Sequence, residues 1–280
     1  MARLHGGMRR TGRELCLNIV GVAAIGLLVF PVWWALCVAL ENDPNFYATS
    51  PDLLPVHLIW QNVNVALQQV GGDIVTSLIV SASAAVIGVV IAVPTAYALK
   101  RFRVRYSSIV VLVVLLSQMV PGISLSLAFY SQFRRLDLLG SYPGLILADS
   151  TYAVPLMVVL IRAYMVSLPD ELFEAARVDG AGEVRCLWSV VAPMSFPGIV
   201  TAALFGFLGA WGDFVFALTL NSGSSVQPVT LGLFDFQNRY QISWGPIMAT
   251  VIVAAIPAGV ILAVAQRWVR AGLRAGALNG

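Results

Sequence analysis

The sequence has little charge, and it is almost without lysine and histidine. Charged residues make up 11% of its 280 positions, against roughly 25% in an average soluble domain. Hydrophobic residues make up 59%, and the mean hydropathy is +0.84. This composition predicts an integral membrane protein. The net charge of +3 is explained by basic residues on the cytoplasmic side of a membrane, so it calls for no nucleic-acid partner.

The few cysteines and histidines argue against two kinds of site. Cys16, Cys37 and Cys186 are isolated, without a CxxC pair, so we predict packing residues and neither disulfides nor metal ligands. His5 and His57 lie far apart, and the sequence holds no HExxH motif. We therefore expect no metal site, and we assign no catalytic residue.

The sequence also lacks a nucleotide-binding loop. Lys100 is the only lysine, and no GxxxxGK[ST] motif precedes or includes it. The chain therefore cannot hold ATP through a phosphate-binding loop of its own. If it takes part in ATP-driven transport, a separate subunit must hydrolyse the nucleotide.

What the sequence does contain is long apolar runs. About 20 apolar residues suffice to cross the hydrocarbon core of a bilayer. The first run exceeds the apolar region of a signal peptide, normally about 7–15 residues, so we expect an uncleaved span. A break is expected at Pro121-Gly122, and a kink within the sixth run is expected around Pro257. The predicted fold is all-α with six transmembrane helices, at residues 15–40, 74–99, 109–133, 142–166, 198–220 and 246–268.

Basic residues give this topology an orientation. Residues 15–268 form the predicted transmembrane domain, between tails of residues 1–14 and 269–280. Of the 17 lysines and arginines, 13 fall in segments that are inside if both tails are cytoplasmic. Three fall outside, and Arg162 lies at an inner helix end. Because positive charge marks the cytoplasmic side, both termini are predicted to be cytoplasmic.

A polar segment, residues 167–197, separates the fourth and fifth runs. Its seven charges would cost about 20 kcal/mol in lipid, at roughly 2.5–3.5 kcal/mol each. The segment must therefore lie in water or against another protein. Ser167 with Asp170 predicts a capped helix start, Gly180 predicts its end, and a second amphipathic helix runs until Pro193.

The first of these helices suits a docking role. Ala175 and Ala176 leave it a low surface that a partner could approach closely, next to the acidic Glu174. Helices this short are marginal alone in water, so packing must supply most of their stability. The segment is therefore predicted to be a docking element.

Polar residues within or beside the apolar runs are candidates for a translocation pathway. Asp149 and Tyr152 lie in the fourth run, and Gln118 adjoins the break in the third. Trp211 and Asp213, in the fifth, combine a ring that can stack on a sugar with a carboxylate that accepts hydrogen bonds from hydroxyls. The alternative for Trp211 is a place in the aromatic belt at the membrane surface.

Three stretches resemble one known family. Glu174-Ala175-Ala176 with Asp179-Gly180-Ala181, Pro193 and Pro197 resembles the EAA loop of the membrane subunits of binding-protein-dependent ABC importers. The sequence WGDF at 211–214 resembles the W-N-D-F stretch of the carbohydrate branch, with glycine in place of asparagine. The C-terminal QRWVRAGLRAGALNG is similar to the tail of sugar-importer permeases. The chain thus resembles a permease subunit of a carbohydrate-type importer, like those for maltose or glycerol phosphate.

The resemblance implies the type I fold of ABC importer permeases, with the polar segment as a cytoplasmic coupling loop that fits a cleft on an ATPase subunit. Ala192 and Cys186 depart from the usual loop pattern, where leucine and an aromatic or apolar residue are common. Both replacements are small and apolar, so they cast little doubt on docking. The residues expected to contact the ATPase are Glu174, Ala175, Ala176, Asp179, Gly180 and Ala181.

The resemblance also implies partners and a place in the cell. We expect a second six-span permease that differs from this chain, two ATPase subunits that use ATP and Mg²⁺, and an extracytoplasmic solute-binding protein or lipoprotein. The assembly would lie in the lipid of a bacterial plasma membrane. It would carry a sugar or sugar derivative by alternating access.

Three alternatives remain open from the sequence. One is an importer of the same kind for a peptide, phosphate or amino acid, against which the WGDF stretch and the C-terminal tail argue. A membrane-embedded enzyme is a second, but Asp149 and Asp213 have no histidine or second carboxylate in the same run. The third is a passive channel, in which the docking loop would have no role.

Overall fold

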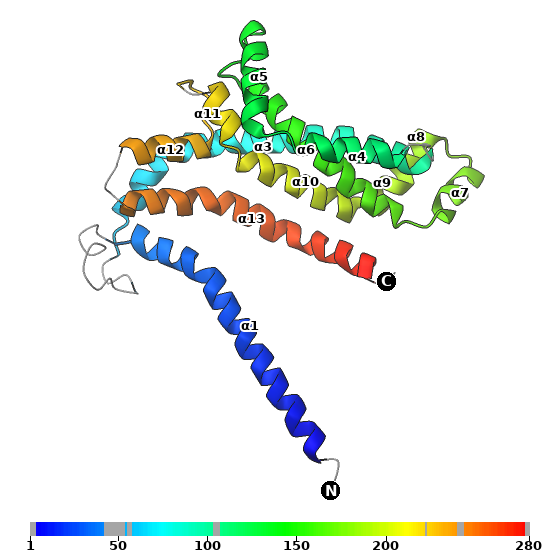
Figure 1. Cartoon of the computed structure of the whole chain (residues 1–280), viewed down its shortest axis with the longest axis horizontal. Coiled ribbons are helices and arrows are strands. Elements are labelled where there is room, and N and C mark those ends of the chain that lie inside the picture. Colours follow the sequence, from blue (N-terminus) through cyan, green and yellow to red (C-terminus); the bar gives the residue numbers. More distant parts are fainter. Residues whose placement is uncertain are drawn as a thin grey trace. The chain divides into compact units, whose positions relative to one another are not determined.

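The computed structural model describes residues 4–41, 54, 58–102, 107–221, 223–239 and 244–277. The described residues form helices and connecting loops, without a strand. Contacts divide the chain into two units, described separately below (Figure 1). The first comprises Met1–Gln68 and Gln237–Val253, and the second comprises Gln69–Phe236 and Ala254–Gly280.

The first unit holds α1 (Leu4–Ala39) and the beginnings of α3 (Gln61–Arg101) and α13 (Trp244–Ala277). Asn62 Nδ2 donates to the backbone oxygens of Ala39 at 3.1 Å and Glu41 at 3.2 Å. A Cβ on Gly245 would lie 2.5 Å from the same Asn62 nitrogen. Glycine therefore lets the start of α13 approach the start of α3.

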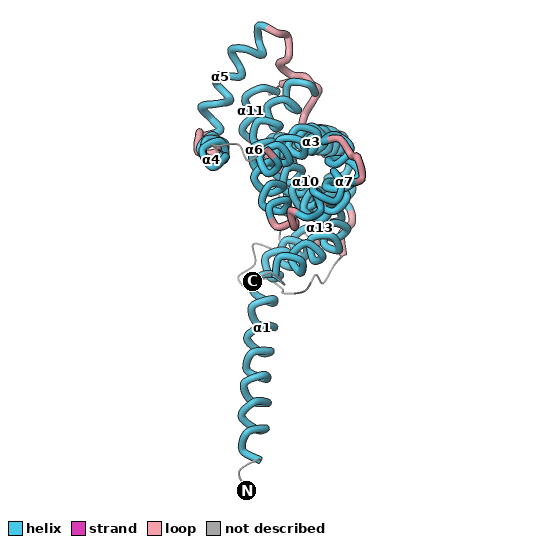
Figure 2. The backbone as a smooth tube through the Cα atoms, turned by 90° about the vertical axis from the view of Figure 1, so that its right-hand side faces the viewer, coloured by secondary structure: helices cyan, strands magenta, loops and turns pink. Residues whose placement is uncertain are grey.

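The second unit is built on α3, α6 (Tyr142–Val166) and α10 (Phe196–Trp211), which lie side by side (Figures 1 and 2). Small residues allow close packing, as is typical between helices in a bilayer. A Cβ on Gly198 would lie 2.5 Å from the Tyr164 ring, and one on Gly206 would lie 2.8 Å from Met157 Sδ. The core buries apolar side chains of all three helices and of the polar loop.

Among the residues that the structure describes, four helices are long and apolar enough to cross a membrane, and the number reaches six if each of two bent pairs is one span. The four are α1, with its apolar part at Leu17–Ala39, α3, α6 and α13. The predicted second span, residues 74–99, is part of a longer helix, because α3 begins at Gln61 and ends at Arg101.

The third predicted span is broken where the sequence indicated. Helix α4 (Ser107–Ser117) and helix α5 (Gly122–Arg135) meet at 85°. Pro121 has no N–H to donate and disfavours helix at the residue before it. Two bonds from the α6 side support the break. Gln118 Nε2 donates to the Tyr152 oxygen at 3.1 Å, and the Tyr152 hydroxyl donates to the Val120 oxygen at 2.8 Å.

The fifth predicted span is not one helix, and this expectation was wrong. Helix α10 ends at Trp211, and α11 (Val215–Asn221) begins after a break that the sequence did not indicate. The Asp213 carboxylate accepts from the backbone N–H groups of Phe216 at 3.4 Å and Ala217 at 3.1 Å. Asp213 thereby caps α11, which is the physical reason that a new helix starts there.

The segment after α11 holds a further helix, α12 (Val229–Arg239). Its first N–H, on Val229, donates to Ser77 Oγ of α3 at 2.8 Å. The hydroxyl of Thr230 donates to the Asp213 backbone oxygen. These bonds fix the start of α12 against α3 and against the break after α10.

The polar segment forms α7 (Glu171–Val178), α8 (Glu183–Cys186), a π-helix (Leu187–Val191) and α9 (Ala192–Met194). Its last part meets α10 at 79°. The predicted cap at Ser167 was wrong, because its hydroxyl donates to the Tyr164 oxygen at the end of α6. The predicted end of the first helix is confirmed, since α7 stops at Val178 and Gly180 has φ +75°.

Candidate functional site

Ion pairs hold the polar loop against the last turn of α3. Lys100 Nζ lies 2.7 Å from Asp170 Oδ1, just before α7. Arg101 Nε lies 3.2 Å from Glu183 Oε2, and Arg177 Nη2 lies 3.2 Å from Glu183 Oε1. The hydroxyl of Tyr97 donates to Glu183 Oε2 at 2.6 Å. Glu183 thus links α3, α7 and α8. We call Glu183 and its partners Tyr97, Arg101 and Arg177 the Glu183 cluster.

Glu183 is held in its ionised form. The hydrogen bonds from Tyr97 and then Arg101 lower the pKa of the Glu183 carboxyl from its ordinary value of 4.5 to about 2. Both donors stabilise the charged form of the acid, and the charge of Arg101 acts in the same direction. Glu183 is therefore ionised throughout the neutral pH range.

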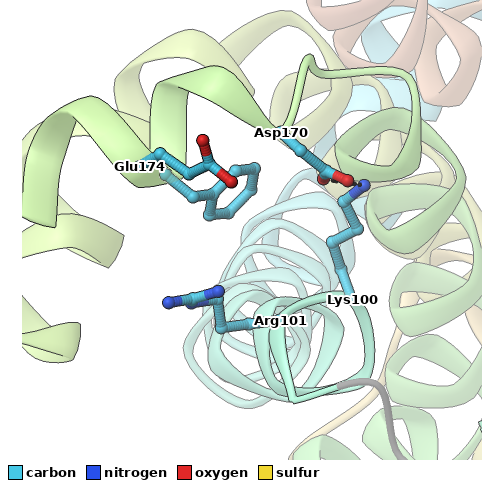
Figure 3. Close-up of a pocket in the computed structure, with 5 residues that line it drawn as sticks. Lys100, Arg101, Asp170 and Glu174 are labelled. Atoms are coloured by element: carbon cyan, nitrogen blue, oxygen red, sulfur yellow. Dashed lines mark ion pairs between the residues drawn. The ribbon is translucent and has the colours of Figure 1, made fainter.

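Phe173 fastens α7 to the same end of α3. Its ring is 4% exposed and stacks on Tyr97 with centroids 6.2 Å apart. Lys100 Nζ lies 5.8 Å and Arg101 Cζ 6.0 Å from the centre of the ring, within the range of a cation–π contact. A cavity of about 240 Å³ lies here, lined by Lys100, Arg101, Asp170, Phe173 and Glu174 (Figure 3).

The six residues predicted to contact an ATPase divide into three groups by exposure. Glu174, Ala175, Asp179 and Gly180 are exposed, and Ala181 is partly exposed. Ala176 is 6% exposed and packs in the core with Phe173. Ala176 is therefore not part of the outer surface that we expected. Its small side chain lets α7 pack closely on the core of the second unit.

Sequence reasoning missed three apolar side chains on the outside of the same loop. Val178 is 87% exposed, Val184 is 74% exposed and Trp188 is 53% exposed. In the sequence, Val178 precedes the exposed turn at Gly180, and Val184 and Trp188 follow it. The available signal was the apolar residue type at these three positions of a segment that is too polar for lipid.

A second site is a cavity of about 480 Å³ between α6, the break at Gln118 and the end of α10. Four of the five predicted pathway residues line it, namely Gln118, Asp149, Tyr152 and Asp213. They come from three separate segments, namely the break after α4, helix α6 and the break after α10, so only the fold brings them together. We call this space the carboxylate cavity.

The fifth pathway residue, Trp211, lies elsewhere. It is 9% exposed and stacks on Phe207, with ring centroids 5.7 Å apart. Its neighbours in the core include Val229 of α12 and Ala254 of α13. Trp211 is therefore packed in the interior of the second unit and does not line the carboxylate cavity, although its neighbour Asp213 does.

The two acids in the cavity have different surroundings. Asp213 caps α11 with both carboxylate oxygens. Asp149 is 6% exposed, and its carboxylate accepts no hydrogen bond and forms no ion pair with any residue that the structure describes. The described parts of the chain hold no group of three or more His, Cys, Asp or Glu side chains placed to bind a metal.

Comparison with known proteins gives the family. Residues 84–275 match the family described as the binding-protein-dependent transport system inner membrane component. The chain belongs to this family. It is therefore a multi-pass membrane protein and a transport subunit, and the family does not consist of enzymes. Members are parts of importers, so the chain acts with other importer components.

Relatives resemble the chain over nearly its whole length. The trehalose transport system permease protein SugB of Mycobacterium tuberculosis is 30% identical, covering 94% of this chain and 96% of its own. The diacetylchitobiose uptake system permease protein DasC of Streptomyces coelicolor is 29% identical, with shares of 94% and 96%. The sulfoquinovosyl glycerol transport system permease protein SmoH of Agrobacterium fabrum is 28% identical, with shares of 92% and 93%.

Solved structures show the same fold. A chain of a bacterial ABC transporter involved in the import of alginate matches with a TM-score of 0.75 at 19% identity, over 93% of this chain and 97% of that chain. A chain of the methionine ABC transporter MetNI matches with a TM-score of 0.58 at 18% identity, over 74% and 97%. The predicted ABC importer permease fold is confirmed.

Proposed function

We propose that this chain is the permease subunit of an ATP-driven importer and forms half of the pathway for a sugar or sugar derivative. The other half would be a second six-span permease that differs from this chain. The solute crosses by alternating access, in which the helices open first to the outside and then to the inside. Orientation with both termini in the cytoplasm follows from the distribution of basic residues.

The observation that carries the proposal is the polar loop. It is fixed to α3 by the Glu183 cluster and by Phe173, while Glu174, Ala175, Asp179 and Gly180 face outward. A loop that is bound firmly on one side and open on the other can transmit movement from a partner to the membrane helices. The partner must contact it differently in the two states, since otherwise no equilibrium shifts.

The proposed partner at this loop is an ATPase subunit, and two such subunits would bind ATP and Mg²⁺. The chain needs no cofactor of its own under this proposal. An extracytoplasmic binding protein or lipoprotein would deliver the solute, with membrane lipid around the spans and no part for nucleic acid. The exposed apolar side chains of Val178, Val184 and Trp188 support a protein partner rather than a solvated surface.

A sugar is the proposed solute because three relatives that match over nearly the whole chain are named for glycosides, namely trehalose, diacetylchitobiose and sulfoquinovosyl glycerol. The WGDF stretch and the C-terminal tail point in the same direction. The alternative is a non-sugar solute such as a peptide, phosphate or amino acid.

Purification in a mild detergent from the native membrane, followed by mass spectrometry, tests the proposal. We expect an ATP-binding subunit, a second six-span protein and a solute-binding protein to accompany the chain. The chain alone, stable and without ATPase activity, would contradict an ATP-driven importer and favour the passive channel. Screening the recovered binding protein against sugars then tests the solute.

A further inference from the structure

The acidic and basic residues that line the carboxylate cavity are all acidic. Asp149 and Asp213 both line it, and none of the lining residues that the structure describes is a lysine, arginine or histidine. The basic residue of α6, Arg162, is 13 positions from Asp149, which is about 20 Å along a helix. On the side of the pathway that this chain supplies, an anionic solute would thus meet two acids and no compensating charge among the lining residues.

Hydrogen-bonding capacity in the cavity also favours a solute that donates. Asp149 is 6% exposed and lines the cavity, and its carboxylate accepts no hydrogen bond from the residues that the structure describes. Tyr152 and Gln118 already use a donor each on backbone oxygens. What the walls offer is therefore mainly acceptors. The oxygens of Asp149 are therefore available to accept hydrogen bonds from a solute in the cavity.

The apolar part of the lining suits a ring-shaped solute. Phe205, Phe214 and Phe216 line the cavity beside Tyr152, and aromatic faces pack on the apolar face of a sugar ring. Gly209 adds no side chain to the lining, and the space beside it is open, since a Cβ there would meet nothing within 4 Å. The volume of about 480 Å³ lies in the usual range for small-molecule sites, about 300–1,000 Å³.

We propose that this chain contacts the solute itself, at the carboxylate cavity, and that the cavity accepts uncharged, hydroxyl-rich solutes and rejects anionic ones. Asp149 receives hydroxyl hydrogen bonds in this arrangement, and Asp213 adds negative charge while it caps α11. This inference rests on the proposed function and adds a selectivity to it. The second permease need not then be the only subunit that recognises the solute.

The test places a thiol in the cavity with Gly209→Cys, in a chain whose three native cysteines are replaced by serine. The whole importer, in lipid nanodiscs, is treated with two methanethiosulfonates that differ in charge, the trimethylammonioethyl and the sulfonatoethyl reagents. For each reagent, the rate of reaction with the cavity thiol is divided by the rate of its reaction with a small free thiol in solution. We expect the cationic reagent to be favoured by about tenfold, because nearby charges in a site of intermediate dielectric act at this strength.

Asp149→Asn is the deciding variant, because it keeps the size of the side chain and removes its acidic group. It should reduce the preference for the cationic reagent by about threefold or more. Asp213→Asn should act in the same direction, since asparagine can still cap a helix. A thiol from Gly259→Cys, on α13 and also in open space, is the matched control, and its preference should not change with Asp149→Asn.

Three results would overturn the proposal. They are equal normalised rates of the two reagents, an unchanged preference in Asp149→Asn, or no reaction at the thiol while the Gly259→Cys control reacts. ATPase activity of the purified importer is measured in parallel. If no ATPase subunit accompanies the chain, the proposed function fails. If the importer is complete and active but the preference is absent, only the selectivity fails.

Discussion

Gly180 shows at the scale of one residue how the loop is adapted to a partner. Its φ of +75° costs a residue with a Cβ about 1–2 kcal/mol. A Cβ at this position would nevertheless meet nothing within 4 Å. The requirement for glycine inside this chain is therefore conformational, and the open space beside it is available to another protein.

We expect Gly180→Ala to reduce uptake and Gly180→Arg to abolish it, with the amount of protein in the membrane unchanged. Alanine strains the turn, and arginine also fills the space of the partner. Solute uptake and membrane abundance are measured together. Gly182→Ala is the control, because Gly182 has φ −68° and equally open surroundings. Normal uptake by Gly180→Arg would contradict the docking assignment.

Asp213 caps α11 and also lines the carboxylate cavity, so the substitution must separate these two roles. Alanine would remove the cap of α11, which typically costs about 1 kcal/mol, so a loss of activity would not report on the pathway alone. Asparagine keeps an acceptor for the N–H groups of Phe216 and Ala217. For this reason Asp213→Asn is the informative variant.

At the scale of elements, the end of α3 and the polar loop form one mechanical connection. Lys100, Arg101 and Tyr97 hold Asp170 and Glu183 on either side of α7. The pair Lys100–Asp170 is partly exposed, with Asp170 63% exposed, and exposed pairs contribute only about 0–1 kcal/mol. Glu183 has three partners, so it should contribute more to the connection.

We expect Glu183→Ala to lower the solute transported per ATP hydrolysed by several-fold, because α7 could then move without moving α3. The ratio is measured in proteoliposomes that contain the whole importer. Glu171→Ala is the matched control, since Glu171 is an exposed acid in the first turn of α7. An unchanged ratio in Glu183→Ala would show that the cluster does not carry the coupling.

The effect of Glu183→Ala should be independent of pH between about pH 6 and 8. The pKa of Glu183 is depressed to about 2, so its contribution is fully present above its ordinary value of 4.5 and is lost only as the pH falls toward 2. Uptake measured across this range in the variant and the parent should change in parallel. A difference that varies between pH 6 and 8 would argue against the assigned ionised state.

At the scale of the whole molecule, the distribution of basic residues predicts the orientation. Alkaline phosphatase, which is active only outside the cytoplasm, should be inactive when fused after residue 268 and active when fused after Gly140 or Gly223. The physical reason is that 13 of the 17 basic residues would then be retained on the cytoplasmic side. The opposite pattern of activity would reverse the topology and remove the polar loop from an ATPase.

The sequence predicted breaks in helices only where the chemistry of one residue forces them. Pro121 indicated the break between α4 and α5, because proline cannot continue the hydrogen-bond ladder. The break after Trp211 depends on Asp213 accepting N–H groups that belong to the next helix, and nothing in an apolar run distinguishes such a cap from a buried acid. The π-helix Leu187–Val191 likewise left no signal in the sequence that we used.

The sequence by itself determined the membrane class, the polar loop and the glycine turn, because each depends on composition or on the conformation of one residue. Only the tertiary structure decided which side chains meet. It buried Ala176 and left Val178 outside, and it placed Asp149 in the cavity and Trp211 in the core. The reason is physical: a helix that is apolar on all sides has no polar face to mark what it packs against.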